Sequence, residues 1–222
     1  MPRNPFSEGI YKLKAKNKLA GKIIPLSGMN EDNYPVKTSM LGVVPQGKVI
    51  LSSDVAAFLD VVDDTTKETG REIAFLLFGK TQGQVVYIDN YIVNGLSDSM
   101  NAHFSSAINS ALQNFINSSE KDGTDMVVHG HSHPKLGNYY NNFSLGDMEA
   151  YTKFREANNV FNSNKIWLSS CLVVDGNFNF LFYDGNDYYK FNEVYEQKSD
   201  GKLKKLKCYQ SPDIIINRDR EY

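Results

Sequence analysis

The chain has 222 residues, of which 41% are hydrophobic and 23% are charged, so it is long enough to bury the core of an ordinary globular protein. Its 24 basic and 26 acidic residues leave a formal net charge of -2, which gives no electrostatic basis for nucleic acid as a partner. The two cysteines, Cys171 and Cys208, form neither a CxxC pair nor a disulfide framework, and Cys171 is interpreted as a buried thiol.

No segment of the chain predicts a membrane partner. The longest purely apolar run, Ile73–Phe78, is far too short to cross a bilayer, and the first 16 residues contain no signal-peptide core. We therefore expect a cytoplasmic protein. A short basic cluster near the C-terminus is interpreted as a solvated segment; it consists of Lys202, Lys204, Lys205 and Lys207.

Residues 1–48 carry most of the helix-breaking prolines and predict only short extended pieces, such as Lys22–Ile24. We interpret them as an N-terminal extension of unknown role, which packs on the main domain or docks a partner. The main domain is expected to span residues 49–192. Residues 193–222 form a charged C-terminal extension, in which Ile214–Ile216 could add an edge strand.

Hydrophobic periodicity within the main domain predicts helices and strands in a mixed order. Ser52 or Ser53 is expected to cap the first helix. The expected helices are Asp54–Thr66, Ala102–Ser118 and a third from just after Ser144 to about Asn158. The expected strands are Arg71–Gly79, Val85–Val93, Asp125–Gly130, Ile166–Val174, Asn177–Tyr183 and Tyr188–Phe191. This order predicts a single α/β (α+β) domain with a mixed β-sheet flanked by helices.

Three of the four histidines lie within residues 127–147, at His129, His131 and His133. Alternate residues of an extended segment point to the same side, so His131 and His133 can direct their rings at one metal ion, and His129 has the same parity. A catalytic zinc ion takes three protein ligands and keeps one position for water. Asp147 is the nearest downstream carboxylate, and the expected third helix would aim it at the histidines.

The segment His131–Pro134 (HSHP) followed by Ser144–Asp147 (SLGD) resembles the JAMM motif, HxHP…SxxD, of the MPN+/JAB zinc metalloprotease family. The family also has a glutamate on an upstream strand, and Glu72–Gly79 (EIAFLLFG) matches that strand. The order of the expected elements is similar over roughly residues 50–190. The resemblance implies an MPN/JAB-like domain with a cytidine-deaminase-like architecture.

The resemblance also implies a role for each matching residue. His131, His133 and Asp147 would hold one catalytic Zn²⁺. Glu72 would act as the general base toward the zinc-bound water and then pass a proton to the leaving amine. Ser144 would donate a hydrogen bond to the oxyanion. Members of the family cut peptide or isopeptide bonds, often at the C-terminal tail of ubiquitin or a ubiquitin-like protein, so a ubiquitin-like protein substrate is the expected partner.

The chain departs from the family pattern at three places. Phe75 stands where the family usually has a small residue, and His129 replaces an aromatic residue that often precedes the motif. We interpret His129 as a structural residue or as support for a ligand. The loop Lys135–Phe143 is long, and its rings either line a substrate groove or pack on one another; they are Tyr139, Tyr140 and Phe143. His103 is interpreted as a residue of the surface or of the second helix start.

Simpler interpretations stand beside these roles. Ser144 and Asp147 also match a helix capping box, which is compatible with the motif because a cap would orient the carboxylate. Glu72 could instead form a surface pair with Arg71. Two other functions stay open: a non-catalytic MPN-type scaffold that binds partners, and a zinc hydrolase that acts on a small amide.

Overall fold

The structure is a computed structural model of the chain. It describes residues 13–14, 23–25, 47–96, 110, 112–117, 124–135, 143–162, 166–183, 187–191, 193–208 and 213–214. Its helices are α1 (Ser53–Thr69), α3 (Leu145–Glu156) and α4 (Asn159–Asn162), and residues 112–117 are also helical.

The strands form two sheets. A small sheet pairs β1 (Leu13–Lys14) with β12 (Asp213–Ile214). The strands of the large sheet are β2 (Ile23–Pro25), β3 (Lys48–Ser52), β4 (Ile73–Gln82), β5 (Val85–Leu96), β6 (Met126–Ser132), β7 (Trp167–Val174), β8 (Asn177–Tyr183), β9 (Asp187–Phe191), β10 (Glu193–Gln197) and β11 (Leu203–Lys205).

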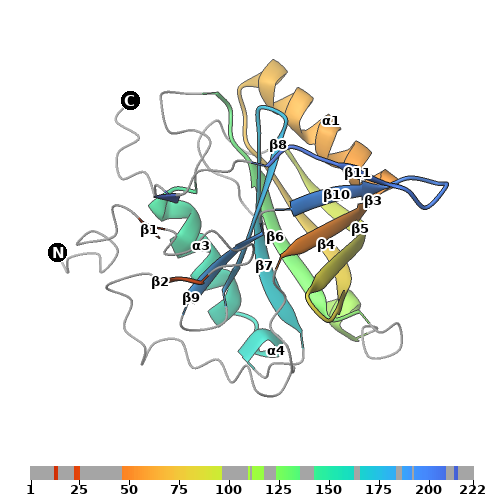
Figure 1. Ribbon diagram of the computed structural model, residues 1–222. Coiled ribbons are helices and arrows are strands. Elements are labelled where there is room, and N and C mark those ends of the chain that lie inside the picture. Colours follow the sequence, from red (N-terminus) through yellow and green to blue (C-terminus); the bar gives the residue numbers. More distant parts are fainter. Residues whose placement is uncertain are drawn as a thin grey trace.

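The large sheet is mixed, as the sequence predicts. Within the described part of the chain, ten strands form this sheet in the order β11-β10-β3-β5-β4-β6-β7-β8-β9-β2. The pairs β10–β3, β3–β5 and β6–β7 are parallel, and the other neighbours are antiparallel. Strands β4 and β6 lie side by side at the centre of the sheet, with α1 on one side and α3 and α4 on the other (Figure 1).

Helix α1 begins and ends at well-defined caps. Ser52 accepts a hydrogen bond from the backbone N–H of Val55, which satisfies one of the free amides of the first turn. Gly70 ends the helix with a left-handed backbone (φ 65°), a conformation that glycine adopts without strain. The helix buries a stripe that includes Leu59 and Val62, so it covers one face of the sheet.

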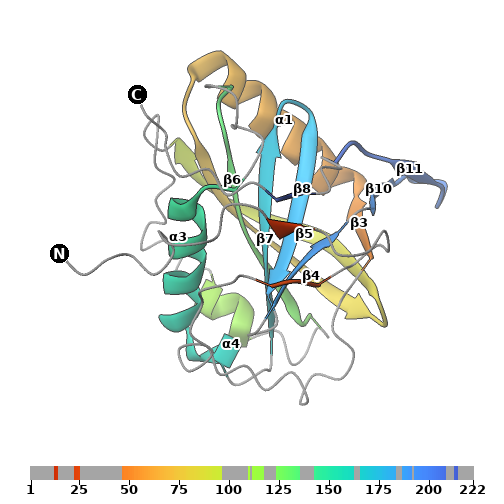
Figure 2. The same cartoon turned by 60° about the vertical axis from the view of Figure 1, so that its left-hand side comes forward.

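Because side chains alternate across a strand, each central strand contributes to two cores. Phe75 and Leu77 of β4 belong to the core under α1. Leu76 and Phe78 belong to the core on the opposite face, with Tyr151 of α3. Figure 2 shows α3 standing against that second face, away from α1. The polar site described below lies on the α3 face.

The first and third predicted helices are confirmed, and Ser52 rather than Ser53 is the cap of α1. The structure corrects two strand boundaries near the motif. Strand β4 begins at Ile73, so Glu72 immediately precedes the strand, and β6 extends through Ser132, so His131 lies within a strand. The predicted helix 102–118 lies mostly outside the described residues, and only 110 and 112–117 of it are described, as helix.

The predicted C-terminal extension contributes two strands to the main sheet. Strand β10 pairs with β3, and β11 pairs with β10, so residues 193–205 continue the sheet beyond residue 192. The predicted edge strand near Ile214 is instead β12, which pairs with β1. The exposed lysines of β11 face carboxylates: Lys204 lies 3.7 Å from Glu196, and Lys205 lies 3.8 Å from Glu193.

Both cysteines are buried, and for Cys171 this confirms the buried thiol that the sequence predicts. Burial raises the pKa of the Cys171 thiol well above its usual value, because the charged thiolate is poorly solvated in the core. Within the described residues, no helix combines the length and the hydropathy that a bilayer span requires.

Candidate metal centre

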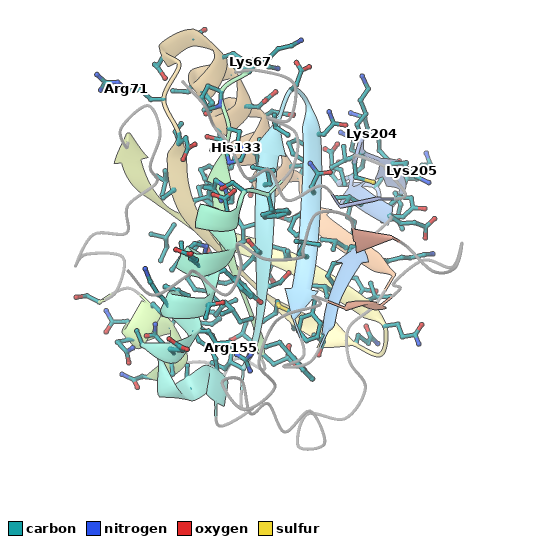
Figure 3. All side chains as sticks on the ribbon, turned by 90° about the vertical axis from the view of Figure 1, so that its left-hand side faces the viewer. Lys67, Arg71, His133, Arg155, Lys204 and Lys205 are labelled. Atoms are coloured by element: carbon teal, nitrogen blue, oxygen red, sulfur yellow. The ribbon has the colours of Figure 1, made fainter. Side chains whose placement is uncertain are left out.

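Strand β6 and the residues that follow it directly present His131 and His133 on the α3 face. Their Nε2 atoms lie 3.0 Å apart, and both side chains are almost fully buried. The backbone N–H of His133 donates to the carbonyl of Val173 at 3.0 Å, which fixes this residue beside β7 although β6 has ended. Figure 3 shows His133 beside one end of α3, with Arg155 near the other end.

Helix α3 supplies the third member of the cluster from its first turn. Asp147 Oδ1 lies 3.1 Å from His131 Nε2, and Asp147 Oδ2 lies 3.3 Å from His133 Nε2. The helix begins with a capping box in which Ser144 and Asp147 satisfy each other's backbone amides. This local structure holds the Asp147 carboxylate against its own helix end, so the rigid helix aims it at both rings.

The donor set fits a tetrahedral zinc ion. Bonds of about 2.0–2.1 Å place two ligands of a tetrahedral ion about 3.3–3.4 Å apart. The two Nε2 atoms lie 3.0 Å apart, and each lies 3.1 or 3.3 Å from a different oxygen of the Asp147 carboxylate. Two neutral imidazole nitrogens at 3.0 Å can share only one proton between them, whereas both can donate lone pairs to one cation. Two histidines with one carboxylate also form a common protein ligand set for catalytic zinc.

Glu72 lies beside this cluster without joining it. Antiparallel pairing of β4 with β6 places Ala74 opposite His131, so Glu72, two residues earlier, lies on the same face near His133. Glu72 Oε1 is 3.9 Å from His133 Nε2, and the Glu72 side chain is buried. The expected neighbourhood of the Glu72 strand and the histidine strand is therefore present, and Glu72 is not half of an exposed pair with Arg71.

The electrostatics of the cluster favour an ionised Asp147. Burial alone raises the pKa of this carboxyl, but electrostatic interactions and hydrogen bonds with the His131 and His133 rings hold the pKa well below its usual value. A carboxylate that stays negative beside two imidazoles is suited to bind a cation. The structure thus brings together all three predicted ligands.

His129 lies outside the ligand cluster of His131, His133 and Asp147. Its ring packs against Phe154 with centroids 4.8 Å apart and meets Tyr151 edge-on at 6.4 Å. Burial, with a smaller contribution from His131, lowers the pKa of His129 to about 3, so the ring is neutral. The sequence leaves two roles open for His129, a structural residue or support for a ligand, and this packing favours the structural role.

The structure describes only some of the other residues that the sequence singles out. Phe143 is buried in the core on the α3 face, and its ring meets His131 edge-on at 6.2 Å, so it packs behind a candidate ligand. His103, Tyr139 and Tyr140 lie outside the described residues. The predicted oxyanion donor, Ser144, is half-buried next to Asp147.

Phe75, the large residue at a usually small position, has a structural partner in Gly130. The two residues are opposite each other in the β4–β6 pair. A Cβ atom on Gly130 would come within 2.0 Å of Phe75 Cε2, so the glycine leaves the space that the Phe75 ring fills. The large Phe75 ring is therefore accommodated on the α1 face, which is the face opposite the candidate ligands.

The residue at the x position of the HxHP motif also makes specific contacts. Ser132, between the two ligand histidines, points to the α1 face, where its hydroxyl contacts Thr66 and the backbone of Ile73. The alternation of side chains in an extended segment could have placed Ser132 on that face. Its partners could not be found from sequence, because they lie 59 and 66 residues earlier.

Comparisons with known proteins leave the family of the chain open. No protein-family profile matches the chain, and no curated protein matches it. Among solved structures, the chain is similar to the solution structure of protein DSY2949 from Desulfitobacterium hafniense, with a TM-score of 0.38 and 16% sequence identity. That match covers 78% of this chain and 95% of the other. A likeness at this level indicates neither a shared family nor a shared activity.

Proposed function

We propose that the protein is a zinc-dependent metallopeptidase or isopeptidase. The observation that carries the proposal is the convergence of His131, His133 and Asp147 on one point, with the Glu72 carboxylate beside them and outside the ligand set. Structural metal sites are usually closed by four protein ligands, whereas three ligands with a nearby acid are typical of hydrolytic sites.

The arrangement of the elements supports an MPN/JAB-like architecture with a cytidine-deaminase-like order. A helix precedes the strand that follows Glu72, and that strand lies beside the histidine strand. The helix that carries Asp147 packs across the same face. These are the relationships that the JAMM motif requires between its separated parts, and they support assigning the motif residues to one site.

Each site residue has a chemical task in the proposed reaction. When bound, a zinc ion would polarise the scissile carbonyl and lower the pKa of a water molecule toward about 7. Glu72 accepts a proton as water attacks the carbonyl carbon. The C–N bond then breaks, and Glu72 returns the proton to the nitrogen of the leaving amine. The Ser144 hydroxyl donates a hydrogen bond to the carbonyl oxygen as negative charge develops there.

The proposed substrate is a protein tail, with the C-terminus of a ubiquitin-like protein as the first candidate. This choice comes from the motif resemblance. A direct test uses ubiquitin that carries a C-terminal aminomethylcoumarin amide, with a glycine dipeptide carrying the same amide as a second probe. Preference for the ubiquitin probe supports a protein substrate, and preference for the dipeptide supports the small-amide alternative.

The Glu72→Gln variant tests the mechanism. It keeps the size of the side chain and removes the base, so it should retain zinc and lose at least about a hundredfold in turnover. Glu68→Gln is a matched control, because Glu68 is exposed on α1 and should retain full activity. Wild-type protein that binds zinc and cleaves neither probe at a rate above that of Glu72→Gln would favour the scaffold alternative.

A further inference from the structure

Ser132 links the two strands that carry the site from the face opposite the site. It lies between His131 and His133, and its side chain points to the α1 face with no exposed surface. Its Oγ accepts a hydrogen bond from the backbone N–H of Ile73 at 2.9 Å. The same Oγ lies 2.5 Å from Thr66 Oγ1, where one hydroxyl donates to the other.

Thr66 connects Ser132 to the C-terminal end of α1. Its side chain is 1% exposed, and its carbonyl accepts the N–H of Gly70 at 2.9 Å. The chain from Thr66 to Ile73 is therefore fixed at both ends by one pair of hydroxyl groups. Glu72 lies within this span, adjacent to the residue whose amide Ser132 binds.

Sheet pairing alone holds this part of the chain less firmly. On the β5 side, the register shifts between Ile73 and Phe75, so the β4 ladder is irregular where it begins. Glu72 precedes the first residue of β4. The hydrogen bond from the Ile73 amide to Ser132 adds an anchor to the backbone directly beside Glu72.

We propose that Ser132 and Thr66 are positioning residues for Glu72, and we call their hydroxyl pair the Thr66–Ser132 bracket. The bracket joins the strand of the ligand histidines to the backbone beside the base, so it sets the separation between base and ligands. This inference rests on the proposed function, since it assigns the base its position. Because a misplacement of about 1 Å can cost roughly a hundredfold in rate, such an anchor acts on turnover.

A matched pair of variants isolates the hydroxyl group. Ser132→Thr and Ser132→Val have the same shape, so any crowding at this fully buried position affects both, but only the threonine keeps the hydroxyl. Thr66→Val removes the second hydroxyl with almost no change in volume. The Ile73 amide is a direct reporter, because it donates to Ser132, and its hydrogen exchange can be followed by NMR without any substrate.

The bracket predicts a specific pattern for Ser132→Val relative to Ser132→Thr. Exchange of the Ile73 amide should be at least about tenfold faster in Ser132→Val, while core amides such as Leu59 exchange alike in both variants. The dissociation constant for zinc should differ by less than about twofold. Turnover of the ubiquitin–aminomethylcoumarin probe should be about ten- to a hundredfold lower, with KM nearly unchanged. Thr66→Val should also speed exchange of the Ile73 amide and lower turnover, but by smaller factors than Ser132→Val.

Equal exchange at Ile73 and equal turnover in the two Ser132 variants overturn the inference. It is also overturned if all core amides exchange faster together and turnover falls only with the folded fraction, because that is the result of a merely structural hydroxyl pair. If wild-type protein does not cleave the probes, the proposed function fails with the base assignment. The Ile73 exchange rate then still decides whether the bracket anchors the chain beside Glu72.

Discussion

Ser144 and Asp147 hold each other at the start of α3. The backbone N–H of Ser144 donates to Asp147 Oδ2 at 2.5 Å, and the backbone N–H of Asp147 donates to Ser144 Oγ at 3.2 Å. The same Asp147 carboxylate lies against His131 and His133. The cap and the ligand assignment are therefore compatible, and the Ser144 hydroxyl still has its own proton to donate.

Replacing Ser144 should affect both stability and turnover. Ser144→Ala removes the side-chain acceptor of the cap, so the free energy of unfolding should fall by about 1 kcal/mol. Turnover should fall about a hundredfold or more, because the donor to the developing oxyanion is also lost. Urea denaturation and turnover of the ubiquitin–aminomethylcoumarin probe measure the two effects separately.

Ser52→Ala provides the control for that experiment, because Ser52 caps α1 in the same way and lies outside the candidate site. It should lose similar stability and keep its turnover. Equal turnover in Ser144→Ala and Ser52→Ala would show that Ser144 serves only as a cap.

His129 should tolerate replacement by another ring. It packs against Phe154 and Tyr151 and lies outside the ligand cluster, so His129→Phe should fold and bind one zinc ion per chain. His131→Phe, two residues later on the same face, should fold and lose zinc. Metal analysis of the two purified variants tests the assignment, and loss of zinc from His129→Phe would make His129 a ligand.

Gly130 should not accept a side chain while Phe75 is present. A Cβ atom there would overlap the Phe75 ring, so Gly130→Ala should lower the free energy of unfolding by about 1–3 kcal/mol or more. Adding Phe75→Leu should recover part of this loss, with a coupling energy of about 0.5–3 kcal/mol in a double-mutant cycle. Strict additivity in urea denaturation would contradict the packing described for this pair.

Lys67 should contribute to the free energy of unfolding, and this contribution should be lost at alkaline pH. Its hydrogen bond to Asp63 at 2.5 Å raises the pKa of Lys67 above its usual value. The contribution is therefore complete below the unfolded pKa of about 10.5 and is lost as pH rises through the folded pKa. Because the lysine side chain is 42% exposed, Lys67→Met should cost less than about 1 kcal/mol at pH 7. Thermal denaturation should show the difference from wild type shrinking above pH 10.5; a constant difference would contradict it.

The sequence predicts the elements that have strong periodicity or strong end signals. The stripe of α1 and the SxxD start of α3 each give a local pattern, and both helices are present. The sequence does not predict strand β10, because the charged and polar residues of Glu193–Gln197 are typical of an exposed segment. In the fold, Val194 is fully buried and Glu196 is 8% exposed, and parallel pairing with β3, far away in sequence, makes this segment a strand.

In the candidate site too, the features set by neighbouring residues can be predicted from sequence, and those set by distant contacts cannot. The spacing of His131 and His133 and the cap that orients Asp147 are local, so they can be predicted from residue order. The position of Glu72 depends on the pairing of β4 with β6 and followed from the motif resemblance. The contact of Ser132 with Thr66 and Ile73 had no sequence signal, since a buried hydroxyl can find partners on any neighbouring element.

Zinc content measures the central claim most directly. Protein purified without chelators and analysed by mass spectrometry of its metals should contain one zinc ion per chain. Asp147→Asn keeps the size of the side chain and removes its charge, so this variant should lose most of the zinc, whereas Glu72→Gln should keep it. Wild-type protein that binds no stoichiometric zinc, even after incubation with the ion, would contradict the assignment of His131, His133 and Asp147 as a metal centre.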